Sequence, residues 1–310
     1  MRWVTYVSPR DGREHVGLVR ADTVYGLRSG ERLLDLLSDA GRSLADAEAD
    51  ITADPLDTLP EPEAQLCAPI PEPPSIRDFM AFEQHVVTSM AALGRTVDPG
   101  WYDNPVFYFT NPAAVRGPRD DIEISPGSRQ FDYELEAAVV IGRPGSNIHP
   151  VDADAHIAGY TILCDWSARD LQDQEMRQNL GPAKGKDGAT SLGPYLVTPD
   201  EVADRQRGNG PDLIMTTTVN GKPYSAGNLA DLHWTFAEMI SYASRGTRLR
   251  TGDVIGSGTV GTGCILELAR VHGGRAYPWL QPGDEVTLAI QGLGSIRSRI
   301  QPASAVVPLR

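Results

Sequence analysis

Carboxylates occur in three short stretches of the sequence, and together they could hold a metal ion. The stretch FDYELEAAVVIG places Glu134 and Glu136 two residues apart, directly before an apolar run. Side chains of a strand alternate between its faces, so these two glutamates point the same way and repel each other. The stretches RDFMAFEQH and CDWSARDLQ add Asp78 and Asp165. Four carboxylates could converge on one divalent cation, and oxygen donors favour Mg²⁺, Mn²⁺ or Ca²⁺ over zinc.

A plainer explanation of the two glutamates is an exposed strand face, on which Asp132 would be a third member. The apolar run of residues 137–141 argues against this explanation. A strand that is covered on both faces has no solvated side, and continuous apolar runs are typical of such strands.

The stretch after Asp165 also has two interpretations. Ser167 and Asp170 fit the capping box of a well-started helix. In such a helix Asp165, Arg169 and Gln172 would share one face, because they are four and three residues apart. An acid, a guanidinium and an amide on one face could form the wall of a site, or a plain Asp–Arg helix pair.

Two further stretches carry basic residues that could take part in chemistry. GPAKGKDGATSLGP contains Lys186, but it does not meet the spacing of a phosphate-binding loop. It is interpreted as a mobile surface loop, or as a flexible segment that delivers Lys186 to an anionic substrate. Among the six histidines only His85 lies beside another candidate residue. The sequence contains no G-x-S-x-G and no H-E-x-x-H.

The composition restricts the class of protein. The chain has 310 residues, of which 41% are hydrophobic, and its formal net charge is −13. An acidic surface argues against nucleic acid or an anionic membrane as a partner. Cys67, Cys164 and Cys264 form no C-x-x-C pair and are expected to be free thiols. No run approaches the roughly 18 apolar residues of a membrane span, so a soluble cytoplasmic protein is expected.

Residues 1–72 are expected to form a small N-terminal module, and residues 73–310 a second, larger domain. In the module, the patterns predict a strand at 2–8, a hairpin at 15–27 and an amphipathic helix at 31–50. Seven prolines between Pro55 and Pro74 predict an extended connection without regular structure.

The larger domain is predicted to be mostly β with few helices, which is an α+β fold. Strands are expected in seven ranges: 131–142, 158–167, 193–199, 213–224, 252–261, 264–271 and 284–300. Asn220-Gly221 predicts a hairpin turn, and residues 231–246 predict a helix that Gly246 ends. Strands and helices do not alternate, which excludes Rossmann and TIM-barrel folds.

Four motifs together resemble the fumarylacetoacetate hydrolase family. They are DYELEAAVVIG, GYTILCDWSARDLQ, GDVIGSGTVGTG and LQPGDEVTLAIQGLGSIRSRI, in this order and spacing. The resemblance covers roughly residues 75–310. It implies a mixed β-roll domain preceded by a small N-terminal module, a homodimer, and a divalent cation, with Mg²⁺ expected first and Mn²⁺ or Ca²⁺ as alternatives.

The resemblance also assigns roles to single residues of this sequence. The metal ligands would be Asp78, Glu134, Glu136 and Asp165; the general base would be His85, oriented by Glu267; the anion-stabilising residues would be Arg169, Gln172 and Lys186; and the substrate contacts would be Tyr108, Thr259 and Met80. Met80 stands where a tyrosine often contacts substrate in the family. The presence of both His85 and Glu267 resembles the hydrolase branch.

The reaction that the resemblance implies is hydrolysis of a C–C bond in a β-diketone or acylpyruvate, with His85 as the base. One alternative is decarboxylation or tautomerisation of a 2-oxo acid on the same metal site, which needs no water. Another is a metal-stabilised binding protein without turnover. A two-carboxylate glycosidase is a fourth hypothesis, since paired strand carboxylates can lie about 5 Å apart. Chelators separate the metal-dependent hypotheses from the glycosidase.

Overall fold

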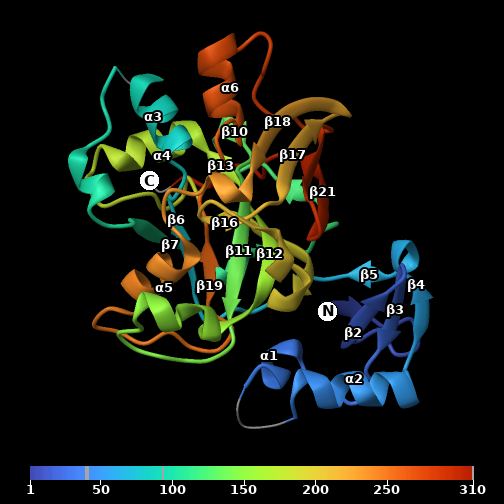
Figure 1. Ribbon diagram of the computed structural model, residues 1–310. Helices are drawn as coiled ribbons and strands as arrows, with labels where there is room; N and C mark the ends of the chain where they lie inside the picture. The colour runs from blue at the N-terminus through green and yellow to red at the C-terminus, as the bar shows by residue number, and fades with distance from the viewer. Residues whose placement is uncertain (39–41, 93, 309–310) are drawn as a thin grey trace.

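A long mixed sheet runs through the structure, which is a computed structural model that describes residues 1–38, 42–92 and 94–308. In the described residues the sheet has 12 strands, in the order β4-β3-β2-β1-β14-β12-β11-β19-β6-β7, with β5 on β1 and β8 on β14 (Figure 1). Its strands are β1 (Arg2–Val7), β2 (Glu14–Arg20), β3 (Thr23–Gly26), β4 (Thr58–Pro60), β5 (Gln65–Leu66), β6 (Ile76–Phe79), β7 (Phe107–Thr110), β8 (Val115–Arg116), β11 (Leu135–Ile141), β12 (Ile157–Asp165), β14 (Thr190–Val197) and β19 (Val254–Gly256).

A second sheet has the strand order β18-β17-β20-β21-β9, and two short strand pairs lie apart from both sheets. The strands are β9 (Ile122–Glu123), β17 (Ile214–Val219), β18 (Lys222–Asn228), β20 (Glu285–Ile290) and β21 (Gly294–Gln301), and the pairs are β10 (Phe131–Asp132) with β13 (Ser167–Ala168) and β15 (Gln206–Arg207) with β16 (Gly210–Pro211). This mostly β architecture with few helices confirms the predicted fold class.

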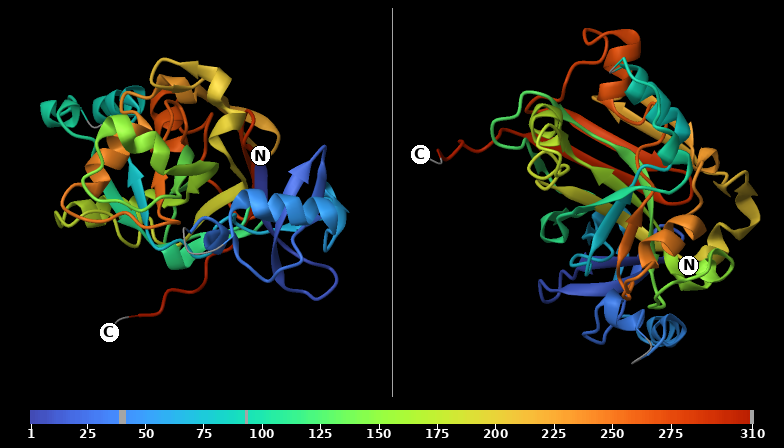
Figure 2. Two further views of the ribbon diagram at one scale, coloured as in Figure 1. Left: turned by 60° about the horizontal axis from the view of Figure 1, so that its bottom comes forward. Right: turned by 90° about the vertical axis from the view of Figure 1, so that its left-hand side faces the viewer.

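The helices are short and lie around the sheets. The α-helices are α1 (Leu33–Leu36), α2 (Leu44–Ala53), α3 (Glu83–Ala92), α4 (Arg169–Met176), α5 (Phe236–Ser244) and α6 (Ile265–His272). The 3-10 helices are η1 (Glu61–Glu63), η2 (Pro99–Tyr102), η3 (Pro112–Ala114), η4 (Pro150–His156), η5 (Pro199–Glu201), η6 (Ala203–Arg205) and η7 (Leu229–Asp231). Helices α3 and α6 lie side by side at one end of the molecule, and the N-terminal strands lie toward the other (Figures 1 and 2).

Strand β11 is buried on both faces, because each face packs into a different hydrophobic core. Ala137, Val139 and Ile141 belong to the larger core. Ala138 and Val140, which point the other way, belong to the smaller one. Every residue of β11 is buried. The interpretation of this stretch as an exposed strand face is therefore wrong.

The N-terminal strands join the main sheet directly. Strand β1 pairs antiparallel with β14, with Trp3 opposite Leu196. Both side chains are fully buried and belong to the smaller core. A division of the chain at residue 72 stays a prediction, although the sheet itself continues across the two parts.

Several local predictions are confirmed. The N-terminal hairpin forms as β2 and β3. Asn220 and Gly221 connect β17 to β18, and both have positive φ angles, 52° and 74°. This is the backbone that an Asn-Gly hairpin turn requires. The predicted helix at 231–246 forms its regular part as α5, where Thr235 caps the first turn by accepting a hydrogen bond from the Glu238 N–H.

Two other local predictions are wrong, and a third holds in part. The single helix expected at 31–50 is two helices, α1 and α2, and residues 39–41 of this range lie outside the described part. In the proline-rich connection, residues 67–75 form no helix or strand, as predicted, but residues 58–66 form β4, η1 and β5. Pro60 ends a strand and Pro62 lies in the first turn of a 3-10 helix, where no N–H donor is needed. The strand expected at 264–271 is helix α6, whose buried Ile265 and Leu268 follow helical spacing.

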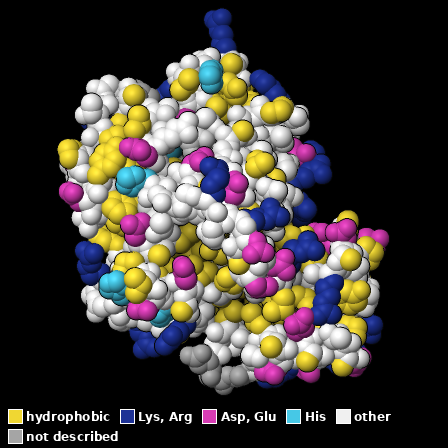
Figure 3. Space-filling view, viewed as in Figure 1, with side chains coloured by type: hydrophobic (Ala, Val, Ile, Leu, Met, Phe, Trp, Pro, Cys, Tyr) yellow, Lys and Arg dark blue, Asp and Glu magenta, His cyan; other side chains and the backbone are white. Residues whose placement is uncertain are grey.

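The expected partners, a small-molecule substrate without nucleic acid or membrane, stay a prediction. None of the helices in the described part of the chain is long and apolar enough to cross a membrane. On the face shown in Figure 3, acidic and basic side chains are intermixed. The cytoplasmic location stays a prediction.

Candidate active site

The strand order brings the four predicted carboxylates to one end of the main sheet. Strand β11 runs antiparallel to β12 and to β19, and β6 runs parallel to β19. The start of β11 therefore lies next to the ends of β12 and β6. Glu134 and Glu136 stand at that start, Asp165 ends β12, and Asp78 lies near the end of β6. By strand alternation all four continue the face that forms the smaller core.

The four carboxylates are buried together. Their exposed fractions are 3% for Asp78, 6% for Glu134, 0% for Glu136 and 1% for Asp165. Carboxylate oxygens of Asp78, Glu134 and Asp165 lie within 4.8 Å of one another. Like charges at this separation in a buried site need compensation by cations or protons.

Three oxygens of this cluster have no hydrogen-bond partner among the described residues: Asp78 Oδ1, Glu136 Oε1 and Asp165 Oδ1. Burial, and then the neighbouring carboxylates, raise the pKa of Asp78 and of Glu136 well above the usual range. Buried oxygens without donors, in an all-oxygen donor set, fit a hard divalent cation such as Mg²⁺. The cluster is therefore a candidate metal site, formed by the four residues that the sequence predicted.

A glycine makes room for these carboxylates. Gly256 pairs with Asp78 across β19 and β6. A Cβ atom at this position would lie 2.5 Å from Asp78 Oδ1 and 3.2 Å from Glu136 Oε2. Gly258, two residues on, donates its N–H to Glu136 Oε2 at 3.0 Å. The glycines of GSGTVG thus allow the backbone to approach the acidic cluster closely.

Lys186 supplies a positive charge to the cluster. Its Nζ lies 2.6 Å from Glu134 Oε2, 2.8 Å from Asp165 Oδ2 and 2.7 Å from Ser167 Oγ. Burial alone would lower the pKa of Lys186, but Asp165 and Glu134 raise it above its usual range. The residue is only 4% exposed. The interpretation of this stretch as a mobile surface loop is wrong for Lys186, because two carboxylates and a hydroxyl hold it.

Arg169 is anchored by two carboxylates. Its Nε donates to Asp132 Oδ2 at 2.9 Å, and its Nη1 lies 2.7 Å from Glu134 Oε1. Nη1 also donates to Gln172 Oε1 at 3.2 Å. Nη2 is buried and has no hydrogen-bond partner within the described ranges. Nε and Nη1 are therefore held in place, and Nη2 is the nitrogen left to bind an anionic group.

The stretch after Asp165 forms neither the capping box of Ser167 and Asp170 nor a helix pair of Asp165 and Arg169, so both of these predictions are wrong. Asp165 ends strand β12, and helix α4 begins only at Arg169, so Asp165 does not share a helix face with Arg169 and Gln172. Ala168 is the N-cap of α4. Ser167 Oγ instead donates to the Asp165 carbonyl, and Asp170 accepts from Ser128 and from the Arg129 N–H. Ser167 and Asp170 thus make these hydrogen bonds and do not form a capping box with each other.

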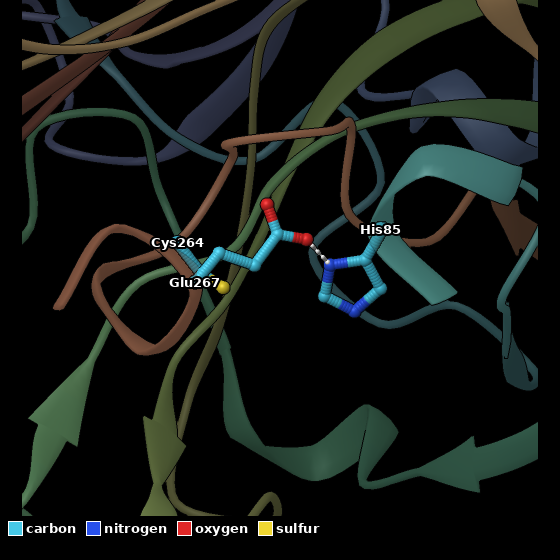
Figure 4. A group of neighbouring side chains, drawn as sticks. All are labelled: His85, Cys264 and Glu267. Carbon is cyan, nitrogen blue, oxygen red and sulfur yellow. Dashed lines mark hydrogen bonds and ion pairs between the residues drawn. The ribbon is translucent and has the colours of Figure 1, made fainter. Parts of the chain in front are cut away.

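His85 and Glu267 form a buried pair beside the acidic cluster. His85 lies in the first turn of α3 and Glu267 in the first turn of α6. The His85 Nδ1 and Glu267 Oε1 are hydrogen bonded, and the Thr262 N–H donates to the other Glu267 oxygen. Figure 4 shows the second ring nitrogen on the side away from Glu267. A carboxylate only accepts, so we assign the proton to Nδ1, which leaves Nε2 as the basic nitrogen.

Of the three predicted substrate contacts, only Tyr108 is hydrogen bonded to the acidic cluster in the described residues. The Tyr108 hydroxyl donates to Asp165 Oδ2, and burial with the charge of Asp165 raises the pKa of Tyr108 well above its usual range. Met80 follows β6 and is half-buried. Thr259 is buried in the loop after β19. In the described residues no hydrogen bond joins Met80 or Thr259 to the four carboxylates, and their substrate roles stay predictions.

Sequence reasoning missed two residues that organise the site. Asp132, considered only as a charge on the strand face, is fully buried and binds both Arg169 and the first turn of α6. Ser167, considered only as a helix cap, contacts Lys186. Their neighbours in sequence are the candidate metal ligands, but their partners are distant in sequence, so no local pattern signals these roles.

The geometry agrees with comparisons to known proteins. The family model for "Fumarylacetoacetate (FAA) hydrolase C-terminal" matches residues 75–301. The chain is 30% identical over 309 residues to the mitochondrial oxaloacetate tautomerase FAHD2A of Bos taurus, covering 97% of this chain and 91% of that protein. It is 30% identical over 240 residues to the oxaloacetate tautomerase YisK of Bacillus subtilis, covering 77% and 73%.

A solved structure resembles the whole chain. It is a fumarylacetoacetate hydrolase from Exiguobacterium antarcticum, with a TM-score of 0.74 and 27% identity, covering 97% of this chain and 99% of that one. The fold and the site thus define an enzyme with a candidate centre for a divalent cation. The chain belongs to the fumarylacetoacetate hydrolase family.

Proposed function

We propose that this protein hydrolyses a C–C bond in an acylpyruvate or a related β-diketone acid, with the aid of a divalent cation. The observation that carries the proposal is the buried His85–Glu267 pair together with four buried carboxylates, of which Glu134 forms a β-bridge with Cys264 at the start of α6. A carboxylate cluster alone could bind a cation without any turnover. A histidine whose tautomer is held by a second carboxylate adds a base that can act on water.

Asp78, Glu134, Glu136 and Asp165 would hold the cation, and the unpartnered oxygens described above fit that role. When bound, the cation would act as a Lewis acid that polarises the carbonyl oxygens of the substrate. Hard oxygen ligands favour Mg²⁺, Mn²⁺ or Ca²⁺.

His85 would take a proton from water through Nε2, and the resulting hydroxide would form a bond to the carbonyl carbon. Glu267 stabilises the imidazolium that forms, because it already accepts from Nδ1. The C–C bond then breaks, and its electron pair is delocalised as an enolate. Protonation of this enolate by His85 gives a ketone, and the other fragment leaves as a carboxylic acid. Atoms and charges balance with one water consumed.

Two basic side chains would stabilise the negative charge of substrate and products. Arg169 Nη2 would bind a substrate carboxylate, because it has no partner among the described residues while the other guanidinium nitrogens are held by Asp132 and Glu134. Lys186 Nζ lies within the acidic cluster and would be close to the developing enolate oxygen.

A second candidate is keto–enol tautomerisation of an oxaloacetate-like 2-oxo acid. Two relatives that are 30% identical are named oxaloacetate tautomerases, and one of them matches 97% of this chain. The same His85 could move a proton between carbon and oxygen without water, so the geometry supports this candidate too. Product analysis separates the two: hydrolysis gives two shorter acids, whereas tautomerisation leaves the carbon skeleton intact.

Substitution of the base tests the proposal. For His85→Ala we expect kcat to fall by on the order of 100-fold or more, while Mg²⁺ binding measured by calorimetry persists, because His85 is not among the predicted ligands. His272→Ala, at an exposed histidine of the same α3–α6 region, is the control and should keep the wild-type rate. A wild-type rate in His85→Ala would show that the assigned base is wrong.

A further inference from the structure

A second cluster of metal-binding side chains lies beside the acidic one. It consists of His85, Cys264 and Glu267, and we call it the thiol cluster. One donor atom from each residue lies within 4.8 Å of the others. All three residues are buried, with exposed fractions of 8%, 0% and 2%. In Figure 4, Cys264 and Glu267 lie on one side of the cluster and His85 faces them.

The fold explains why these three residues meet. Cys264 is the N-cap of α6 and Glu267 follows three residues later, so both side chains lie at the start of the same helix. Helix α3, which carries His85, packs against α6. An isolated bridge between Glu134 and Cys264 fixes the start of α6 next to the acidic cluster. The geometry of the thiol cluster is therefore set by backbone pairing, and not by side-chain contacts alone.

The donor set of the thiol cluster differs in kind from that of the acidic cluster. An imidazole nitrogen, a thiolate sulfur and a carboxylate oxygen are the ligands that Zn²⁺ uses, and three protein ligands leave a fourth position for water. The four carboxylates offer oxygen alone, which favours harder cations. The acidic cluster and the thiol cluster therefore suit different ions, a hard cation such as Mg²⁺ and a thiophilic cation such as Zn²⁺, and both ions could be bound at the same time.

A redox role for Cys264 has less support. Burial, and then the charge of Asp132, raise the pKa of the Cys264 thiol well above its usual range, so the thiol is a poor nucleophile. In the described residues Cys264 also has no disulfide partner. Binding of a cation would lower the pKa of the Cys264 thiol again, because a coordinated ion stabilises the thiolate that burial disfavours.

We propose that the thiol cluster is a second metal site, which takes Zn²⁺ or a similar thiophilic cation and thereby blocks the His85 base. On binding, Cys264 forms a sulfur–metal bond and releases its proton to solvent. The Nδ1 and carboxylate oxygen exchange their mutual hydrogen bond for bonds to the ion, and the imidazole proton moves to Nε2. One proton is released for each ion, and no electron is transferred.

The inhibitory part of this inference rests on the proposed function, because it assumes that His85 acts as the base. The binding part does not. If the protein turned out to have no activity on any dicarbonyl acid, binding to the thiol cluster could still be measured. A titration with Co²⁺ tests the binding, and inhibition by Zn²⁺ tests the effect on His85, so that a failure of one can be told from a failure of the other.

Co²⁺ is the probe for binding, because a thiolate–Co²⁺ bond has an intense near-ultraviolet absorption that carboxylate ligands lack. The protein is first saturated with Mg²⁺ and then titrated with Co²⁺. We expect the band to saturate at one equivalent in the wild type and in Cys67→Ser, whose thiol lies outside the cluster. Cys264→Ser should lose the band. A wild type without the band, or a band that persists in Cys264→Ser, overturns the proposal.

Cys264→Ser is expected to fold, since Cys264 makes no side-chain capping hydrogen bond and serine is a preferred N-cap residue. Its circular dichroism spectrum verifies this. The inhibition experiment then measures turnover with saturating Mg²⁺ and increasing Zn²⁺, relative to the rate of each variant without Zn²⁺. We expect the Zn²⁺ concentration for half inhibition to rise at least about tenfold in Cys264→Ser. An equal Zn²⁺ sensitivity of the two proteins contradicts the inhibitory role.

Discussion

Glu134 forms ion pairs with both basic residues of the site. One of its oxygens pairs with Arg169 and the other with Lys186. Burial alone would raise the pKa of Glu134, but these two cations hold it well below the usual range. Glu134 is therefore ionised at neutral pH, whereas the pKa of Asp78 and of Glu136 is raised. A divalent cation would favour the ionised form of all the carboxylates around it.

At the scale of single residues, the substitution Gly256→Ala should weaken cation binding without changing any charge. The added Cβ would meet Asp78 Oδ1 at 2.5 Å, so Asp78 must move. Overpacking of this kind costs about 1–3 kcal/mol, which corresponds to about a 5- to 150-fold weaker affinity. Calorimetry with Mg²⁺ or Mn²⁺ measures the change. The control is Gly30→Ala, because a Cβ there meets nothing within 4 Å. Unchanged affinity in Gly256→Ala would mean that Asp78 is not a ligand.

At the scale of elements, Asp132 connects the two halves of the site. Its Oδ1 accepts from the Ile265 N–H at 2.8 Å, and its Oδ2 accepts from the Leu266 N–H at 3.0 Å and from Arg169. It thus fixes the start of α6, which carries Glu267, and orients the guanidinium that pairs with Glu134. We interpret Asp132 as a positioning residue and not as a metal ligand.

Asp132→Asn tests this interpretation. An amide keeps one acceptor and places an NH₂ group against N–H donors, so the start of α6 and Arg169 should shift. We expect kcat to fall on the order of 10- to 100-fold, a change in the pH profile of kcat, and an almost unchanged Mg²⁺ affinity. Asp173→Asn, at an exposed aspartate of α4, is the control. Loss of Mg²⁺ binding in Asp132→Asn would instead place Asp132 among the ligands.

The sequence predicted the elements with strong local signals and the four carboxylates that the structure brings together as a candidate metal site. The Asn220-Gly221 turn and the buried strand β11 have patterns that few other structures produce. The stretch at 264–271 has an apolar pattern that is compatible with either strand or helix, and contacts distant in sequence, with α3 and with Asp132, favour the helix. The contacts of Asp132 and Ser167 could not be predicted, because their partners lie far away in sequence.

At the scale of the whole molecule, the N-terminal strands share a core with the strands that carry the site. Trp3 is fully buried, and it belongs to the same core as Ala138 of β11 and Val254 of β19. Strand β1 also covers the edge of β14. The N-terminal part is therefore expected to unfold together with the rest of the chain.

Calorimetry of Trp3→Ala tests this expectation. Removal of a fully buried tryptophan should lower the free energy of unfolding by about 3–5 kcal/mol, and the protein should still show a single transition at a lower Tm. The control is Val151→Ala, which should leave the Tm unchanged because Val151 is 80% exposed. Two separate transitions, of which the substitution shifts only one, would show that the parts unfold independently.

The homodimer that the family resemblance implies stays a prediction at this scale. Light scattering coupled to size-exclusion chromatography would measure it directly. A mass near 33.5 kDa, the mass of one chain, would contradict it.

The central claim is that a divalent cation in the acidic cluster and the His85–Glu267 pair together act on a dicarbonyl acid. The most direct measurement follows the loss of ultraviolet enol absorbance for a panel of acylpyruvates and 3,5-dioxo acids, with excess chelator and then with added Mg²⁺, together with analysis of the products. We predict no turnover with chelator, restored turnover with Mg²⁺, and two shorter acids from at least one substrate. Equal rates with chelator and with Mg²⁺ would contradict the claim.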